Sequence, residues 1–189
     1  MESEKEKVKG IVFIDFVKTI RNAKDDRLLG YLTEKDRDVV SGVVFPGGWY
    51  PMDTFGRCLT AVFEVLGDRN PENARTWGKV FGGKIFSNVY KEISYRVASD
   101  VPDSLKRFIL ISKTFFSDSA LELVALDKQS ARLRVTRIPD LPAVSIYFYV
   151  LSGCIEVYIE LSGGKNVRVE FSQTEVNGKK EVVFHARWD

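Results

Sequence analysis

Apolar residues recur at steps of three and four through the first 116 residues, which is the spacing of one buried helix face. Local signals mark the predicted helix ends. Thr33 with Asp36 three residues later, and Asn70 before Pro71, are typical of helix N-termini. Gly42 is expected to end a helix in the left-handed conformation. The pattern predicts helices over residues 9–22, 34–41, 52–66, 71–89 and 102–116.

The helix predicted after Asn70 contains Gly78, Gly82 and Gly83. Glycine inside a helix costs about 1 kcal/mol relative to alanine. These glycines therefore indicate either that a neighbouring backbone packs closely on this helix or that the helix breaks near Gly82. We favour close packing.

After Asp118 the hydrophobic period changes to two, which is typical of half-buried strands. Residues 121–127 and 131–137 alternate in this way and are joined by the turn DKQS, which predicts a hairpin. A second hairpin is predicted from residues 166–173 and 181–188, because Asn177-Gly178 between them is a strong two-residue turn signal.

The segment between the two hairpins fits both periods. Ile155, Val157, Ile159 and Leu161 alternate as in a strand, yet a helical stripe also runs through the same residues. Length favours a helix, because residues 143–162 contain no internal turn and Gly163 follows as a cap.

These elements predict an α+β fold in which a helical N-terminal half packs on a small antiparallel sheet. In the C-terminal half, two hairpins flank one long helix. Residues 1–7 carry charges of both signs and are expected to form a disordered tail. Residues 8–189 are expected to form a single domain, with a helical subdomain over 8–117 and a sheet-bearing subdomain over 118–189.

Composition excludes several classes of function. Lys+Arg 28 against Asp+Glu 26 leaves a net charge of +2 with no concentrated basic stretch, so no nucleic-acid partner is expected. One His and two Cys cannot form a Cys/His zinc site of about four ligands, so no metal is expected. The sequence contains no acyl-transfer triad motif and no phosphate-binding P-loop. We therefore expect a protein that is not an enzyme.

The expected compartment is the cytoplasm. The charged start MESEKEK is followed by no apolar signal segment. The longest apolar run, residues 143–155, is shorter than the roughly 20 residues of a spanning helix, so no membrane span is expected. Cys58 and Cys154 are interpreted as reduced, buried thiols.

Several segments together carry a resemblance to known domains. They are KGIVFIDFVKTI, the aromatic-proline entry WYPMDTFGRCLTAV, the two hairpins, and the long helix with Gly153 and Glu156 in SGCIEVYIELSGG. This order resembles a poorly characterised bacterial domain family expanded in myxobacteria. More remotely, it is similar to the heme-nitric oxide/oxygen binding domain and to the 4-vinyl-reductase-type ligand-sensing domain.

The resemblance implies a cavity between the two halves that accepts heme or a small hydrophobic molecule. The gas-sensing relatives hold heme with a helical His and a Tyr-x-Ser-x-Arg clamp. Here His185 falls in the last predicted strand, and the region of the clamp reads SARLRVTRIPD. Arg132 and Arg134 could meet propionates, but a solvated strand face explains them better, and no motif flanks Cys58 as a thiolate ligand. We therefore expect no cofactor, with heme an alternative that is disfavoured.

Large aromatic side chains are the best candidates for ligand contacts, although such residues most often belong to an ordinary core. Trp49 and Tyr50 stand in a Pro/Gly-rich loop, which favours the mouth of a pocket or a partner surface. Glu156 and Glu160 share a helix face that we expect to be solvated. The predicted ligand-binding residues are Trp49, Tyr50, Trp77, Phe115 and Tyr149.

The function that follows is a non-enzymatic cytoplasmic sensory domain that holds a small hydrophobic molecule between its helical and sheet halves. One alternative is a signalling adaptor that acts through a protein partner or a homodimer, with the loop FPGGWYP as its surface. A less favoured alternative is a hemoprotein with atypical ligation.

Overall fold

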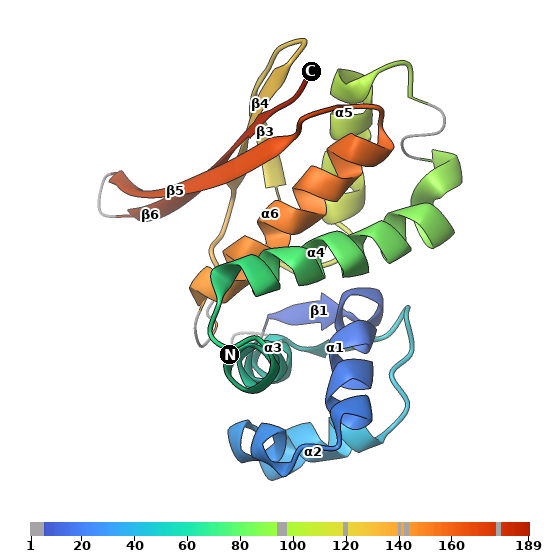
Figure 1. The fold of residues 1–189 in the computed structure, drawn as a ribbon, viewed down its shortest axis with the longest axis vertical. Coiled ribbons are helices and arrows are strands. Elements are labelled where there is room, and N and C mark those ends of the chain that lie inside the picture. The colour runs from blue at the N-terminus through green and yellow to red at the C-terminus, as the bar shows by residue number, and fades with distance from the viewer. Residues whose placement is uncertain (1–5, 94–97, 119–120, 140, 142–143, 177–178) are drawn as a thin grey trace, which may run out of the picture.

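The computed structural model describes residues 6–93, 98–118, 121–139, 141, 144–176 and 179–189. Its N-terminal layer, below α4 in Figure 1, consists of three α-helices, a 3-10 helix and a two-stranded antiparallel sheet of β1 and β2. The elements of this layer are β1 (Lys7–Lys9), α1 (Gly10–Ala23), η1 (Asp26–Tyr31), α2 (Glu34–Ser41), β2 (Trp49–Pro51) and α3 (Met52–Leu66).

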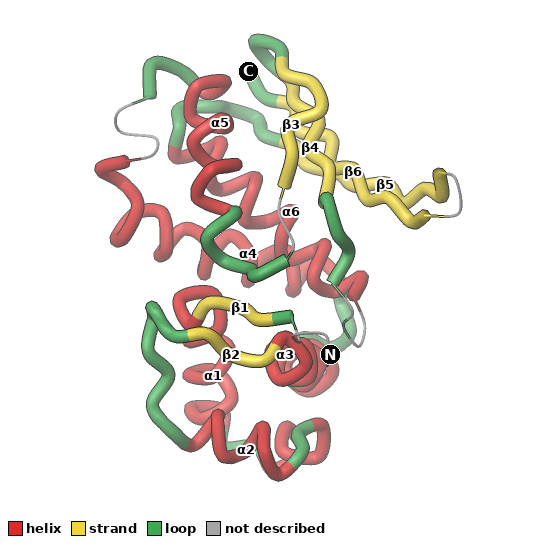
Figure 2. Tube along the Cα trace, turned by 180° about the vertical axis from the view of Figure 1, so that it is seen from behind, coloured by secondary structure: helices red, strands yellow, loops and turns green. Residues whose placement is uncertain are grey.

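The second layer contains the remaining helices and an antiparallel sheet of order β3-β4-β6-β5. Figure 2 shows this sheet beside α5 and α6, with α4 between it and the N-terminal layer. The elements are α4 (Pro71–Ile85), the π-helical turn η2 (Phe86–Tyr90), η3 (Lys91–Ile93), α5 (Val101–Ser112), β3 (Leu121–Leu126), β4 (Ser130–Val135), α6 (Val144–Leu161), β5 (Arg168–Val176) and β6 (Lys179–Arg187).

The structure confirms the predicted α+β class and its two hairpins around a long helix. The ambiguous segment is the helix α6, as its length indicated. Asn70 caps α4 as predicted, and its side chain accepts a hydrogen bond from the backbone of Glu72. The predicted Asn177-Gly178 turn and residues 1–5 of the predicted tail lie outside the described residues.

Several details differ from the sequence-based expectation. The helix predicted over residues 71–89 ends as α4 at Ile85 and continues as the π-helical turn η2. Gly42 ends α2 with a φ of −77°, so it is extended and not left-handed. The helix α5 ends at Ser112, and Phe116 forms an antiparallel bridge with Val8. The periodicity missed β1, β2 and η1, because elements this short have too few residues to show a period.

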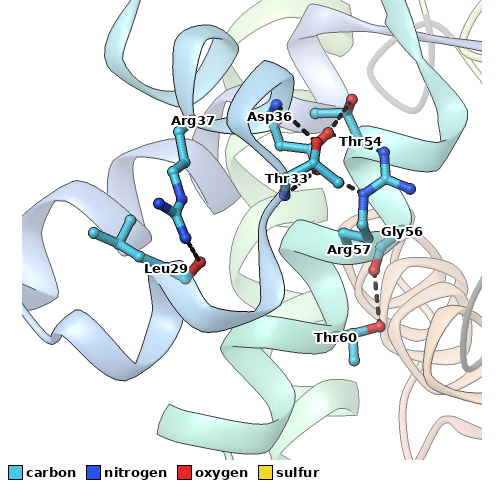
Figure 3. A network of polar contacts seen from close by, with 8 residues as sticks. All are labelled: Leu29, Thr33, Asp36, Arg37, Thr54, Gly56, Arg57 and Thr60. Atoms are coloured by element: carbon cyan, nitrogen blue, oxygen red, sulfur yellow. Dashed lines mark hydrogen bonds and ion pairs between the residues drawn. The ribbon is translucent and has the colours of Figure 1, made fainter.

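A capping network joins α2 to α3 (Figure 3). The Thr33 hydroxyl and the Asp36 carboxylate form the predicted capping box, and the Asp36 residue is fully buried. Arg57 Nε donates to Asp36 Oδ2 at 2.6 Å, and Thr54 Oγ1 donates to Asp36 Oδ1 at 2.6 Å. Burial alone would raise the pKa of Asp36, but the hydrogen bonds from Arg57, Thr54 and Thr33 outweigh it and hold that pKa well below its usual range.

The helices α4 and α6 cross in backbone contact. A Cβ added to Gly78 would overlap the Val150 carbonyl, and one added to Gly153 would overlap the Arg75 carbonyl. This confirms that the glycines of α4 serve close packing. Because α4 stays helical through Gly82 to Ile85, the alternative of a break near Gly82 is excluded.

Ion pairs flank this crossing. Arg75 Nε lies 2.8 Å from Glu156 Oε2, and Lys79 Nζ lies 2.8 Å from Glu156 Oε1 and 2.9 Å from Glu160 Oε1. The expectation of a solvated face is therefore wrong for Glu156, because the close approach of α4 covers that carboxylate with two cations.

By length and hydropathy alone, α6 could cross a membrane, and it is the one described helix that meets both criteria. Core helices of globular domains meet the same criteria. Here α6 packs against α4, α5 and the sheet, and Ile155, Tyr158 and Ile159 are fully buried.

Candidate functional site

The candidate site is an apolar cavity of about 70 Å³ where the N-terminal layer meets the second layer. Val12 and Phe16 of α1 and Phe55 of α3 contribute one wall. The other walls come from α4, η2, α5, the segment after α5, the first two strands of the sheet, and α6. They are formed by Gly82, Ile85, Phe86, Phe108, Ser112, Phe115, Phe116, Leu121, Val135, Tyr147, Val150, Leu151 and Cys154.

Edge-to-face aromatic contacts hold much of this wall in place. The rings of Phe16 and Phe55 are 5.6 Å apart, those of Phe86 and Phe108 are 5.5 Å apart, and those of Phe116 and Tyr147 are 5.7 Å apart. Tilted and edge-to-face pairs of this kind stabilise a core beyond the area they bury. The cavity therefore has a largely preformed aromatic lining.

Two of the polar groups in the lining donate hydrogen bonds to backbone carbonyls. Ser112 Oγ donates to the Ile109 carbonyl at 2.9 Å, and Cys154 Sγ donates to the Gly78 carbonyl at 3.3 Å. Burial raises the pKa of the Cys154 thiol to about 12 and also raises the pKa of Tyr147. At neutral pH both groups are uncharged, so the cavity favours an apolar, neutral ligand.

The structure brings one of the five predicted ligand-binding residues, Phe115, to this cavity. Trp49 is 47% exposed, with Lys9 Nζ 5.0 Å from its ring centroid. Tyr50 packs on Phe13, and its hydroxyl accepts a hydrogen bond from the Phe45 backbone.

The remaining two predicted residues also lie away from the cavity lining. Trp77 approaches Gly67 at the end of α3, and the ring of Tyr149 lies 5.1 Å from that of Phe171 on β5. Ligand contact by Trp49, Tyr50, Trp77 and Tyr149 stays a prediction.

The other side chains that the sequence singled out also lie elsewhere. His185 is exposed on β6, with Nε2 3.3 Å from Ser172 Oγ across the hairpin. Arg134 pairs with Glu122 and Glu181, as expected for a solvated strand face. Cys58 is buried in the core, and burial raises the pKa of its thiol to about 12. Among the described residues, no group of three His, Cys, Asp or Glu side chains is placed to hold a metal ion.

The fold and the cavity together are those of a two-layer α+β domain with an apolar cavity. Solved structures share this fold. One, described as probing heme distortion in the H-NOX family, has a TM-score of 0.61 at 15% identity over 96% of this chain and 95% of that chain. Another is an oxygen-binding H-NOX domain related to soluble guanylate cyclases, with a TM-score of 0.60 at 16% identity over 96% and 95%.

A third similar structure is the iron(II) unliganded form of an H-NOX variant from K. algicida, with a TM-score of 0.63 at 14% identity over 96% of each chain. No family model and no curated protein matches the chain. The remote resemblance to the heme-nitric oxide/oxygen binding (H-NOX) domain is therefore confirmed for the fold. The resemblances to the myxobacterial family and to the 4-vinyl-reductase-type domain stay predictions.

The same finding corrects the expectation about cofactors. We expected no cofactor, with heme disfavoured. That expectation is wrong for this fold, because the solved structures that share it include ones described by heme and by iron(II). The prediction relied on the absence of a helical His and of the propionate clamp. A chain can share the fold without these two motifs, so their absence does not decide which fold it has.

The cavity lining as it stands does not fit a heme held in the usual way. Its described residues include no imidazole and no Lys or Arg, and its axial-ligand types are limited to Cys154 and Tyr147, both protonated at neutral pH. Pockets for drug-sized ligands measure about 300–1,000 Å³. A heme would therefore need an enlarged cavity and an unusual ligand.

Proposed function

We propose that the chain is a cytoplasmic sensory domain without enzymatic activity of its own, and that its ligand occupies the cavity between the two layers. The almost wholly apolar lining of the cavity carries this proposal. Heme is the first ligand to test, because the H-NOX structures that share the fold point to it. A small neutral molecule suits the cavity at its present volume.

The position of the cavity supports a sensory role. Its walls come from both layers, so a ligand that enlarges it must change how α1 and α3 sit on α5 and α6. A ligand shifts an equilibrium between conformations by its difference in affinity for them. Occupancy of this cavity can therefore alter the relative position of the layers.

The test uses hemin and xenon as probes, because hemin needs an enlarged cavity and xenon enters small apolar cavities. Hemin binding is measured by absorption and xenon binding by NMR shifts of the lining residues. Val12→Phe adds a ring to the cavity wall, and Val80→Phe makes the same change at a 47% exposed site on α4. We expect Val12→Phe to weaken binding about tenfold or more, equivalent to about 1.4 kcal/mol.

Circular dichroism checks that both variants fold. The control Val80→Phe should bind as the native chain does. If neither probe binds the native chain, or if the two variants bind equally well, the proposal of a ligand in this cavity fails.

A second candidate function is recognition of a protein partner by the loop between α2 and β2. Val43 is 74% exposed and Phe45 is 65% exposed in this loop, close in sequence to Trp49. Exposed apolar side chains gathered in one loop are typical of interaction sites. Light scattering of the native chain and of Trp49→Ala tests a homodimer through this loop, and an equal mass for both, monomeric or dimeric, would contradict it.

A further inference from the structure

The strand β5 forms one edge of the four-stranded sheet, so one side of its backbone has no strand beside it. Its register with β6 is continuous from Arg168↔Arg187 to Val176↔Lys179. In an antiparallel pair, successive residues alternate between bonding to the partner strand and facing away from it. Once the direction of the backbone N–H and C=O groups is known for one residue of β5, it is therefore known for all of them.

Two independent observations fix that alternation. Arg75 Nη2 donates to the Val169 carbonyl at 2.8 Å, which places this carbonyl on the outer side of β5. Directly after β6, the Trp188 backbone N–H donates to the carbonyl of Gln129, the residue before β4, at 3.1 Å, so it points toward the β4 side of the sheet. Even-numbered residues of β6 thus face β4, so Val169, opposite Ala186, cannot bond to β6.

By the same alternation, the backbone groups of Phe171, Gln173 and Glu175 face outward. Within the described part of the chain, no hydrogen bond outside the sheet ladder satisfies them. Residues 172–175 are exposed, and the hairpin of β5 and β6 projects beyond the helices in Figures 1 and 2. Such an edge can pair with another strand.

We infer that this edge pairs with β5 of a second copy of the chain, antiparallel about a two-fold axis at Gln173. In an isologous interface the same surface of each copy contacts the other, so β5 must pair in antiparallel orientation with an identical strand. Only a register centred on Gln173 uses all three open residues, because it places Phe171 opposite Glu175 and Gln173 opposite itself. The Arg75 guanidinium on Val169 ends the pairing on one side.

The side chains of this segment are compatible with that register. Glu175 is the one ionisable residue between positions 171 and 175, and it lies opposite Phe171 and not opposite its own copy. Ser172 lies opposite Thr174, which is a favourable pair of hydroxyl side chains. No like charges meet, and the two four-stranded sheets become one continuous sheet.

The first test places a charge on the two-fold axis. In the dimer, Gln173→Lys brings two ammonium groups directly opposite each other, which destabilises a strand pair and is screened by salt. Gln173→Thr keeps the backbone N–H and adds no charge, so it is the matched control. Sedimentation equilibrium should show a concentration-dependent dimer for the native chain and the control. For Gln173→Lys we expect a dimer about tenfold weaker, partly restored by high salt.

The second test uses oxidative cross-linking. Opposed residues of a hydrogen-bonded pair have Cα atoms about 5.5 Å apart, within the range of about 4.4–6.8 Å for disulfides. Gln173→Cys should therefore form a disulfide-linked dimer under mild oxidation. Ser172→Cys should not, because position 172 opposes position 174. Of the native thiols, Cys58 is buried and Cys154 is half-buried, and burial raises the pKa of both, so they stay protonated and add little background.

Dimerisation weakened by Gln173→Lys and cross-linking at position 173 would support the β5 pairing. A native chain that remains monomeric at every concentration would overturn the β5 pairing. The edge of β5 would then be available to pair with an extended segment of another protein. Equal cross-linking at positions 172 and 173 would also overturn it, since the register would then be wrong.

Discussion

At the scale of single residues, Asp36 shows how one buried carboxylate joins two helices. It completes the capping box of α2, and it also accepts hydrogen bonds from Thr54 and Arg57 on α3. Removing one partner from a buried ion pair leaves the other charge without compensation. The position therefore matters more to stability than an ordinary helix cap does.

We predict that Asp36→Asn destabilises the fold toward the lower end of about 3–5 kcal/mol, because Arg57 is 30% exposed and partly solvated. The folded-state pKa of Asp36 lies below its usual range. Its stabilisation is thus complete above the unfolded pKa of about 3.9 and is lost as pH falls through the folded pKa. Urea unfolding at several pH values should show a constant difference from neutral pH to about 4 and a smaller one below.

The exposed Asp38 on the same helix is the matched control. The change Asp38→Asn should alter the unfolding free energy by less than about 0.5 kcal/mol. Equal effects at Asp36 and Asp38, or a difference that grows as pH falls, would contradict the role assigned to Asp36.

At the scale of elements, the crossing of α4 and α6 depends on glycine. We predict that Gly78→Ala lowers stability by about 1–3 kcal/mol despite the better helix propensity of alanine, because its methyl group would overlap the Val150 carbonyl. Gly83→Ala on the same helix should instead stabilise by up to about 1 kcal/mol, since its methyl group would meet Val157 Cγ2 at an ordinary 3.5 Å. Thermal unfolding of both variants checks the opposite signs, and a stabilising Gly78→Ala would refute the contact.

The elements that could be predicted from the sequence are those whose signals are local. The capping residues Thr33 and Asn70 act within one helical turn, and both hairpins show a two-residue period over a few residues. The end of α5 depends on a distant contact, because the bridge from Phe116 to Val8 takes that residue out of the helix. The pairing of β1 with β2 spans about forty residues and leaves no local pattern.

At the scale of the whole molecule, the cavity was not predictable residue by residue. Its lining comes from segments spread from α1 to α6. In the sequence, these residues belong to the same apolar patterns as residues of an ordinary core. Aromatic type alone does not separate Phe115, which borders the cavity, from Trp49 and Tyr149, which lie away from it. The resemblance predicted that a cavity lies between the halves, but only the packed structure shows which side chains border it.

The strand β1 connects the two layers at this cavity. Lys9 N–H donates to the Phe115 carbonyl at 2.8 Å, and Ser117 N–H donates to the Lys7 carbonyl at 3.0 Å. The same strand pairs with β2 and buries Val8 completely. It thus holds the segment of Phe115 and Phe116, which borders the cavity, against the N-terminal layer.

We predict that removing residues 1–9 destabilises the fold by about 6 kcal/mol or more, because four hydrogen bonds from Glu6, Lys7 and Lys9 to residues 52, 115 and 117 are lost at about 1 kcal/mol each and the burial of Val8 contributes about 2 kcal/mol. Hydrogen exchange should then speed up in residues 112–118 before it does in α6, because β1 contacts that segment directly. Removing residues 1–5 is the control, since it eliminates none of the contacts described for β1. If both truncations unfold at the same urea concentration, β1 does not join the layers, and the cavity must be closed by α1 and α4 alone.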